Sequence, residues 1–368
     1  MEIKLYDRNL SSPTFIEEIT AKVQGLRFST RLHGGFCVCS FRLKADMPAA
    51  WQWITDKIYY QLVITDKSDV LWEGRIEDIG LSQGAVEVTA YGYYANLGDI
   101  PYKTAYNANF DVVIKAVLTA NCPQISSDQS HIAATGGPAI TSAAGDEYLD
   151  IYPKDIVEKL SQFSDTTYKG RWYFAVWEGR VPYLFRREAT SVDWLVTLGD
   201  FSQFKLKHQG ASLWNSCYAV YESGGTITRT AETDDADSQE KYGDGTNDLK
   251  RQHVIPNLGE VAAATAQAAR DHWLEEYKEL YPSLENMVLG NKVYDSNGKT
   301  RSSALVRAGE VIRVRDLVPA SVDAGSVQRD AFRTFYIVET EYDMDNAELR
   351  ITPDTEKMSL DSILARKI

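Results

Sequence analysis

The sequence is poor in the residues that form most metal sites. Among its 368 residues are 5 histidines and 4 cysteines. No two histidines show the H-x-x-x-H or H-E-x-x-H spacing of a helical zinc site, and each is better explained as structural or exposed. The histidines are His33, His131, His208, His253 and His272. We therefore expect neither a metal ion nor a cofactor.

The four cysteines predict buried, unreactive thiols. Cys37 and Cys39 alternate on an expected strand, which places both side chains on one face. Cys122 and Cys217 stand alone, whereas a zinc site needs a second close pair of cysteines or histidines. Isolated thiols of this kind usually pack as small apolar groups. The pattern suits a protein that folds in a reducing cytosol.

Basic residues and long apolar runs are also scarce. The formal net charge is -13, which argues against general affinity for the phosphate backbone of nucleic acids. No run approaches the ~18 apolar residues of a membrane span, so we expect no stable membrane insertion. The opening residues, "MEIKLYDRNL", lack the basic start and apolar run of a secretory signal. These features predict assembly in a cytoplasm.

Motifs for catalysis are missing as well. There is no G-x-S-x-G elbow before a helix and no glycine pattern for phosphate binding. Two carboxylate pairs, Glu73 with Glu77 and Glu339 with Glu341, could in principle cleave glycosides. Carboxylates on strands of an acidic protein are more often a solvated face, and the interpretation is that the chain is no enzyme.

The residues that are present favour β-sheet. Aromatic residues make up 11% of the chain, with 21 tyrosines and 8 tryptophans, and such residues fit pleated sheets and contact surfaces. The length allows two or three domains. The fold class expected is α+β, mainly β. No period of 20 to 50 residues repeats along the chain, although its two β-rich ends share a general pattern.

Residues 1–103 predict a first β-rich domain built as a meander of strands. In it, Val86, Val88 and Ala90 alternate with polar or aromatic residues, so one face is apolar. Gly92 stands between two tyrosines and indicates a bulge or the close approach of another backbone. Those tyrosines, together with two aromatic residues of a later hairpin, form a candidate contact surface for a partner: Tyr91, Tyr93, Tyr173 and Trp177.

Residues 104–198 predict an inserted α+β domain of two helices and a hairpin. In the first helix the apolar residues recur at helical spacing after a cap at Asn109: Phe110, Val113, Ile114, Val117 and Leu118. The second helix lies in "YPKDIVEKLSQFSD". In the hairpin strand, alternation allows only one set to be buried against the helices, either Trp172, Phe174 and Val176 or Tyr173, Ala175 and Trp177.

Residues 199–355 predict a second β-rich domain, and 356–368 a C-terminal tail. Inserted at about 230–290 are an exposed acidic loop and an Ala-rich helix that starts at a capping-box spacing of Asn257 and Glu260. One stripe of the helix is apolar: Ala262, Ala266, Ala269, Trp273 and Tyr277. The loop does not have the residue order of an EF-hand calcium site and is interpreted as solvated. Its acidic residues are Asp234, Asp235, Asp237, Asp244 and Asp248.

Three stretches together resemble the hub proteins at the distal end of bacteriophage tails, a family shared by contractile and long non-contractile tails. They are the early hairpin "LWEGRIEDIGLSQGAVEVTAYGYYANL", the Tyr-Gly segment "SQEKYGDG" ahead of the Ala-rich helix, and the closing strands "RAGEVIRVRDLVP" and "FYIVETEYDMDNAELRITP". The likeness follows the order of elements over nearly the whole chain.

The resemblance implies two barrels akin to the tail-tube subunit in each chain, and three chains in a ring of six barrels. It implies a virion component that joins the tail tube to tip, spike or fibre proteins and also meets a distal tail or tail-tube protein and the tape-measure protein. DNA would only pass through, and the acidic loop is expected to line the channel. Two alternatives stay open: a distal tail protein in a hexameric ring, and a virion-associated carbohydrate-binding protein or glycosidase.

Overall fold

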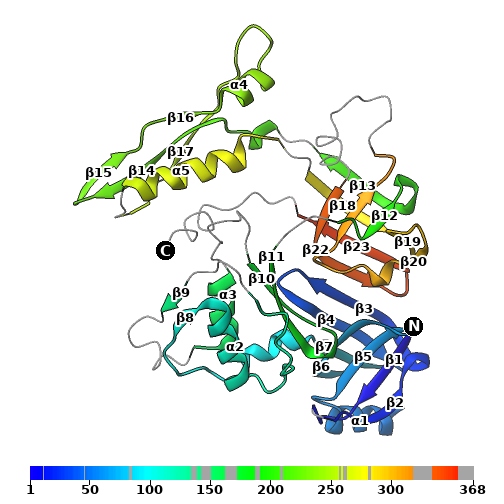
Figure 1. Cartoon of the computed structure of the whole chain (residues 1–368). Coiled ribbons are helices and arrows are strands. Elements are labelled where there is room, and N and C mark those ends of the chain that lie inside the picture. Colours follow the sequence, from blue (N-terminus) through cyan, green and yellow to red (C-terminus); the bar gives the residue numbers. More distant parts are fainter. Residues whose placement is uncertain are drawn as a thin grey trace. The chain divides into compact units, whose positions relative to one another are not determined.

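Strand pairing dominates the computed structural model of the chain (Figure 1), which describes residues 1–10, 12–44, 46–82, 85–133, 139–141, 151–161, 172–186, 191–207, 210–256, 258–259, 263–280, 283–317 and 334–354. The described chain forms two units. The first unit joins Met1–Phe204 to Asn286–Asp354, and the second spans Lys205–Glu285. The boundaries expected from the sequence, after residues 103, 198 and 355, remain predictions.

An antiparallel sheet forms the N-terminal half of the first unit. Its pairing order is β2–β1–β5–β6–β7–β4–β3. The elements are β1 (Glu2–Tyr6), β2 (Phe15–Glu18), η1 (Thr20–Lys22), β3 (Val23–Arg31), β4 (Gly34–Leu43), α1 (Met47–Asp56), β5 (Gln61–Asp66), β6 (Asp69–Ser82), β7 (Ala85–Tyr91) and η2 (Tyr93–Gly98).

The alternation predicted for β7 is confirmed. Val86, Val88 and Ala90 are buried, and Glu87 between them is exposed. Gly92 follows the strand and donates its N–H to the Cys37 carbonyl at 2.7 Å. A Cβ at Gly92 would lie 1.8 Å from the Phe36 carbonyl oxygen, so the predicted close approach of another backbone is confirmed as the reason for glycine here.

Two helices and a hairpin follow in the same unit. The elements are β8 (Asn107–Asn109), α2 (Phe110–Asn121), β9 (Ala139–Thr141), α3 (Pro153–Ser161), β10 (Trp172–Trp177), η4 (Glu178–Arg180) and β11 (Val181–Arg186). All five apolar residues predicted for the first helix are buried on α2. On β10 the set Trp172, Phe174 and Val176 is buried in the same cluster, while Tyr173 and Trp177 are half-buried. Ala175 of the other set is also buried, so the expectation that only one set is buried holds for the large side chains alone.

A second sheet forms the C-terminal half of the first unit. Its elements are β12 (Trp194–Val196), η5 (Leu198–Asp200), β13 (Phe201–Lys207), β18 (Ser283–Leu289), β19 (Lys292–Asp295), β20 (Thr300–Ser302), η7 (Ser303–Leu305), β21 (Val311–Val314), β22 (Thr334–Asp343) and β23 (Glu348–Pro353). Two of these strands, β13 and β18, extend past the bounds of the unit at Phe204 and Asn286. β18 pairs with β23, β23 with β22 and β22 with β21, all antiparallel, and β21 pairs in parallel with β12.

The two halves repeat one four-stranded motif. The pairing order β5–β6–β7–β4 of the first half recurs as β21–β22–β23–β18 in the second. Both long strands carry a bulge at the matching place, Glu77 in β6 and Val338 in β22. β21 and the first four residues of β5 share one burial pattern: two buried residues, one half-buried and one buried. The pattern shared by the two ends of the sequence reflects this repeat.

The two halves are joined edge to edge. β3, at the edge of the first half, pairs antiparallel with β22 of the second. Because β3 pairs with β22 and not with β2, the first half stays open, and among the described residues neither half closes into a barrel. The mainly β class is confirmed, in the form of two open sheets that are continuous through β3 and β22, whereas the closed barrels expected from the resemblance are not found among the described residues.

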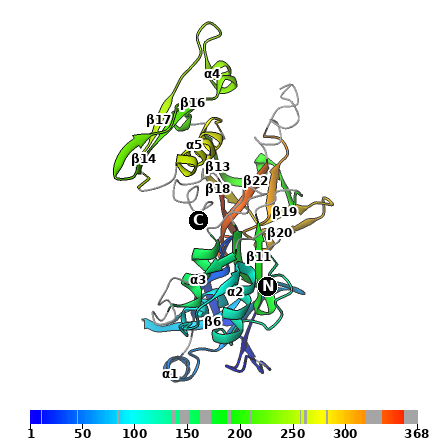
Figure 2. The same ribbon diagram turned by 60° about the vertical axis from the view of Figure 1, so that its left-hand side comes forward.

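The second unit is a small sheet with a helix on it (Figure 2). Its elements are η6 (Gly210–Ser212), β14 (Ser216–Ser223), β15 (Thr226–Arg229), β16 (Thr233–Asp234), α4 (Ala236–Tyr242), β17 (Gln252–Ile255) and α5 (Ala263–Tyr277). From the predicted stripe of α5, Ala269 and Trp273 pack with Cys217, Ala219 and Ile255 of the sheet. Small residues let the helix approach closely.

One expectation for this unit is wrong. The acidic segment predicted to be an exposed loop contains the strand β16 and the helix α4, because Asp235 caps α4 by accepting a hydrogen bond from the Ser238 N–H at 2.9 Å. The capping box predicted at Asn257 and Glu260, like Ala262 of the stripe, lies outside the described residues.

Candidate functional site: the strand junction and the exposed surfaces

The pairing of β3 with β22, here called the junction, brings residues about 310 positions apart into register. Arg31 lies opposite Glu339, and Arg27 lies opposite Asp343. Each pair forms an ion pair of 2.9 Å. Both arginines are more than half exposed, so these pairs set the register of the strands more than they stabilise the fold.

The centre of the junction is buried. The Thr30 and Thr340 hydroxyls share a hydrogen bond of 2.6 Å. Beside them the rings of Phe28 and Tyr342 pack with centroids 5.2 Å apart, and each side chain is 4% exposed. This aromatic contact buries apolar area between the two strands.

Arg307 ties the inserted hairpin to both halves. Its guanidinium pairs with Glu178 at 2.7 Å and donates to the Val70 carbonyl. The same group lies over the rings of Phe36 and Trp177, 5.2 and 5.7 Å from their centroids. A planar cation that is stacked and hydrogen-bonded in this way cannot be replaced by lysine without losing contacts. Sequence reasoning missed Arg307, because one arginine in "RAGEVI" carries no pattern.

Glu310 lies next to Arg307, and its carboxylate is held by two donors. Oε2 accepts from the Trp194 Nε1–H at 2.6 Å and from the Arg307 backbone N–H at 2.7 Å. Burial raises the pKa of this carboxyl to about 7. Arg307 and Glu310 line a pocket of about 320 Å³ together with aromatic residues of the hairpin, including Trp177 and Tyr183.

The structure places the predicted contact aromatics in different settings. Tyr93 is 3% exposed and donates its hydroxyl to Gln61 Oε1 at 3.0 Å, so burial removes it from the expected contact surface. Tyr91, Tyr173 and Trp177 are half-buried. A contact role for these three remains a proposal. The sequence pattern overestimated the exposure of Tyr93, because the alternation of a strand ends with β7 and Tyr93 already belongs to η2.

The two carboxylate pairs considered for glycoside cleavage have structural partners. Burial raises the pKa of Glu73, which accepts the Arg180 N–H at 2.8 Å. Glu77 is paired with Arg75 at 2.6 Å. Glu339 belongs to the junction, and its neighbour Glu341 on the same strand is exposed.

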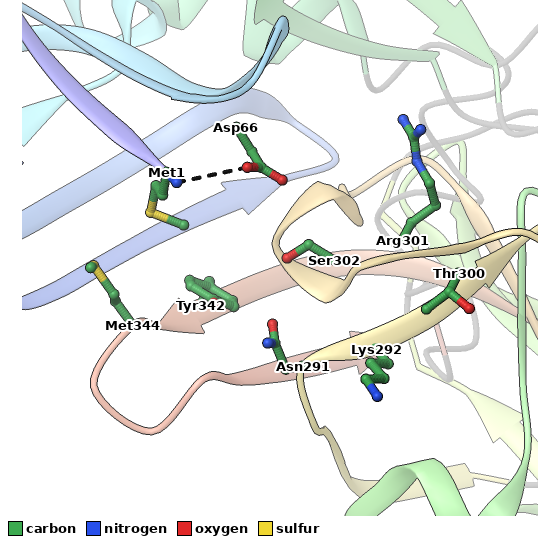
Figure 3. A pocket seen from close by; sticks show the side chains of 9 residues that line it. All are labelled: Met1, Asp66, Asn291, Lys292, Thr300, Arg301, Ser302, Tyr342 and Met344. Atoms are coloured by element: carbon green, nitrogen blue, oxygen red, sulfur yellow. Dashed lines mark ion pairs between the residues drawn. The ribbon is translucent and has the colours of Figure 1, made fainter.

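A second pocket, of about 440 Å³, lies where strands of the two halves face each other (Figure 3). Asp66 is the only carboxylate in its lining and is 3.7 Å from the Met1 amine. The remaining lining is a mixture of amide, hydroxyl, cationic and thioether groups: Asn291, Lys292, Thr300, Arg301, Ser302, Tyr342 and Met344. Among the described residues of this lining, Asp66 has no second carboxylate that could form a glycosidase pair with it.

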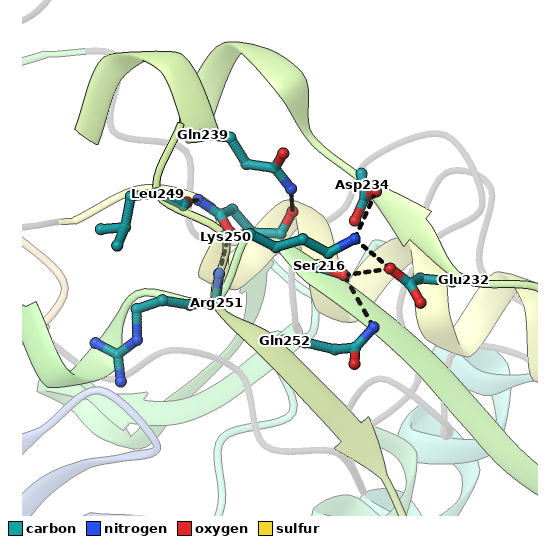
Figure 4. A network of polar contacts seen from close by, with 9 residues as sticks. Ser216, Glu232, Asp234, Gln239, Leu249, Lys250, Arg251 and Gln252 are labelled. Atoms are coloured by element: carbon teal, nitrogen blue, oxygen red, sulfur yellow. Dashed lines mark hydrogen bonds and ion pairs between the residues drawn. The ribbon is translucent and has the colours of Figure 1, made fainter. Parts of the chain in front are cut away.

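The predicted acidic residues are held by several local contacts in the second unit. Lys250 bridges Glu232 and Asp234, the latter at 2.9 Å (Figure 4). Asp235 pairs with Lys278 at 3.1 Å in addition to capping α4. Asp244 accepts the N–H groups of two following residues, which lower the pKa of its carboxyl. Asp237 and Asp248 are exposed.

The described residues offer neither a cluster that could bind a metal ion nor a helix that could span a membrane. No group of three or more histidine, cysteine or acidic side chains could hold a metal ion in this part of the chain. Nor does any described helix combine the length and apolar character that crossing a membrane requires. All four cysteines carry free thiols, and burial raises the pKa of Cys39, Cys122 and Cys217.

Comparison with known proteins gives a match only at the level of structure. No protein-family model and no curated protein matches the sequence. Three solved structures match end to end. The 43 kDa tail protein of prophage MuSo2 from Shewanella oneidensis has a TM-score of 0.57 at 12% identity, over 99% of this chain and 100% of that one.

The other two structures agree. Prophage tail protein gp18 from Listeria monocytogenes has a TM-score of 0.56 at 10% identity, over 100% of this chain and 98% of that one. A tail protein from Neisseria meningitidis has a TM-score of 0.54 at 11% identity, over 100% and 99%. The chain therefore has the fold of these phage tail proteins, and the resemblance to a protein of phage tails is confirmed at the level of the fold.

Proposed function

We propose that this chain is a structural component of a phage virion, the hub at the distal end of the tail. In this proposal three copies form a ring that joins the tail tube to tip, spike or fibre proteins, with a distal tail or tail-tube protein and the tape-measure protein as further partners. The end-to-end likeness to tail proteins supports this proposal, because both chains are covered almost completely.

The single observation that carries the proposal is the repeated motif. One chain contains two tube-like sheets of the same strand order, joined edge to edge through β3 and β22. Three such chains present six equivalent sheets, which is the number needed to continue a hexameric tube. A distal tail protein with one tube-like domain per chain would reach six only as a hexamer.

A structural role without catalysis fits the side chains. Three of the four carboxylates considered for a glycosidase pair are engaged by Arg180, Arg75 and Arg31, and the fourth, Glu341, is exposed. A channel for DNA also fits the formal net charge of -13, since an acidic wall does not retain phosphates. We assign the channel-lining role to the acidic residues of the second unit.

Light scattering tests the proposal. It is measured on the purified chain alone and on the chain mixed with the tail-tube and distal tail proteins of the same virus. A trimer, and a threefold ring in electron micrographs, is the expected result. A hexamer would transfer the chain to the distal tail class. The proposal would be overturned by a chain that stays monomeric under both conditions, binds glycans on an array and cleaves polysaccharide. In that case the activity should be lost in Glu73→Gln or Glu339→Gln.

A further inference from the structure

We propose that the pocket beside Arg307, which is lined by the hairpin of β10 and β11, is a binding site for a neutral sugar ring. The inference goes beyond the proposed hub, because it gives the chain a contact with glycan in addition to its contacts with tail proteins. It does not depend on the number of copies in the ring, since every lining residue belongs to the first unit of one chain.

One part of the pocket lining is aromatic. It consists of Trp177, Tyr183 and Phe185. The pairing of Ala175 with Tyr183 places these three side chains on one face of the hairpin. The opposite face of β10 is buried in the cluster that contains α2 and α3. The aromatic face is therefore the one that is left half-buried at the pocket.

The aromatic side chains are held in place by their neighbours. The Tyr183 ring stacks on the His131 imidazole, with centroids 4.2 Å apart and planes inclined by 18°. The Leu184 N–H donates to the His131 carbonyl at 3.1 Å, which fixes the backbone beside this stack. Trp177 packs edge-on against Phe36 with centroids 5.2 Å apart. Side chains that are ordered before a ligand arrives lose little conformational freedom when it binds.

The rest of the lining is mainly polar and includes two carboxylates. Glu178 is half exposed and pairs with Arg307, and Glu310 lies beside them. Both donors to Glu310 bind its Oε2, and no described residue donates to its Oε1. This oxygen is an acceptor for a ligand hydroxyl. With a pKa of about 7, the carboxyl can also donate near neutral pH.

This lining selects against charged and purely apolar ligands. The two carboxylates, Glu178 and Glu310, repel a phosphate or another anion. A cation is repelled from the aromatic side chains, because the Arg307 guanidinium already lies 5.7 Å from the centroid of the Trp177 ring. An apolar ligand would leave the carboxyl groups without partners. A sugar ring satisfies both parts, since its C–H face packs on aromatic rings and its hydroxyls donate to carboxylates.

The size of the site predicts how many rings it takes. At about 320 Å³ the pocket is near the lower end of typical ligand sites, which measure roughly 300–1,000 Å³, so it has room for one ring. A further pocket of about 330 Å³ is lined by the same Glu178, Arg307 and Glu310, together with Ser68 and Asp69. The shared residues make the two pockets neighbours. We therefore expect a disaccharide to bind more tightly than its monosaccharide.

A glycan array tests the site. The purified chain is applied to neutral oligosaccharides of hexoses and N-acetylhexosamines and to their phosphorylated forms, and the best disaccharide is then titrated by calorimetry. Binding to neutral glycans without cleavage is the expected result. A second measurement uses polysaccharide extracted from the surface of the host bacterium. Binding to that polysaccharide identifies the ligand as a surface glycan, whereas binding to oligosaccharides alone identifies a free sugar.

Variants of Tyr183 locate the binding. Tyr183→Ala should weaken it about tenfold or more, because the ring that packs on the sugar is lost. Tyr183→Leu keeps apolar volume beside His131 but no flat ring, and it should show a similar loss if the alanine variant fails to fold. Tyr183→Phe should bind within about twofold of wild type. The matched control is Trp51→Ala, which removes a 61% exposed ring of α1 outside the pocket and should change nothing. Melting temperatures show which variants are folded.

The outcomes separate this site from the hub. The site is wrong if the wild type binds no neutral glycan, if it binds phosphorylated glycans alone, or if folded Tyr183→Ala and Tyr183→Leu bind as well as wild type. A trimer that binds no glycan leaves the hub standing without the site. A monomer whose glycan binding depends on Tyr183 keeps the site, and the proposed hub then fails.

Discussion

The hydroxyl groups of Thr30 and Thr340 share a buried hydrogen bond of 2.6 Å, although 310 residues separate them in the sequence. The Thr30 hydroxyl also accepts the backbone N–H of Ala308 at 2.9 Å. One side chain of the first half thus satisfies polar groups from two elements of the second half.

Replacing Thr30 should therefore cost more than replacing Thr340. Thr30→Val leaves the Ala308 N–H buried without its acceptor, and we expect a loss of about 1–3 kcal/mol in the free energy of unfolding. Thr340→Val keeps that acceptor, and about 1 kcal/mol is expected. Urea unfolding followed by tryptophan fluorescence measures both. Equal losses in the two variants would contradict the assigned role of Thr30.

Gly92→Ala should prevent correct folding or destabilise the first unit by about 3 kcal/mol or more. The added Cβ would lie 1.8 Å from the Phe36 carbonyl oxygen, which belongs to a paired strand and cannot move away cheaply. Gly98→Ala is the matched control, because a Cβ there meets nothing within 4 Å. The control should change the melting temperature little. A folded Gly92→Ala protein with normal melting would disprove the close approach.

The pKa of Glu310 predicts a fall in stability toward neutral pH. Because burial raises the folded-state value to about 7, the folded protein binds a proton more tightly than the unfolded chain. This carboxyl contributes its full share to the free energy of unfolding at pH values below its ordinary pKa of 4.5. That contribution is lost as the pH rises to about 7.

Glu310→Gln isolates that contribution. The variant keeps an oxygen acceptor for Trp194 and Arg307 but no longer titrates. Between pH 5 and pH 8 the wild type should lose about 2–3 kcal/mol relative to the variant. Melting temperatures of both proteins across this range give the comparison. Parallel curves would show that Glu310 does not titrate in this window.

Arg307→Lys should destabilise the first unit even though the charge is kept. Lysine cannot lie flat on Phe36 and Trp177 while also reaching Glu178 and the Val70 carbonyl. We expect a loss of about 1–2 kcal/mol, and a larger loss for Arg307→Ala. Arg315→Lys, elsewhere in the same half, serves as the control. If Arg307→Lys matches wild type in urea unfolding, the stacked geometry contributes nothing.

The exposed acids of the second unit offer a test of the channel. Asp237→Lys with Asp248→Lys reverses two charges without removing the Asp235 or Asp244 caps. If these residues line the path of DNA, virions carrying the variant should eject DNA more slowly, because lysines hold phosphates. Asp237→Glu with Asp248→Glu keeps the charge and should behave as wild type. Unchanged ejection kinetics in the lysine variant would remove these residues from the channel.

Local patterns in the sequence were enough to predict many elements. The alternation of Val86, Val88 and Ala90 predicted β7, and the helical spacing from Phe110 to Leu118 predicted α2, because burial of one face imposes a period that the sequence must carry. Gly92 signalled a close backbone contact for a similar reason, since no other residue fits there. The resemblance to tail hubs depended on the order of such elements.

The sequence could not predict what these elements do to one another. Tyr93 has the same residue type as exposed tyrosines, and only the turn into η2 buries it. The acidic segment of the second unit contains a capped helix that its polar composition concealed.

By itself, then, the sequence determined the class of the protein, a mainly β chain, because its strands and helices appear as local periods in the order of apolar and polar residues. Tertiary structure alone decided that the two ends form one repeated motif and that β3 pairs with β22. Strand pairing depends on backbone hydrogen bonds between residues about 310 positions apart, and such bonds leave no mark on the order of neighbouring side chains.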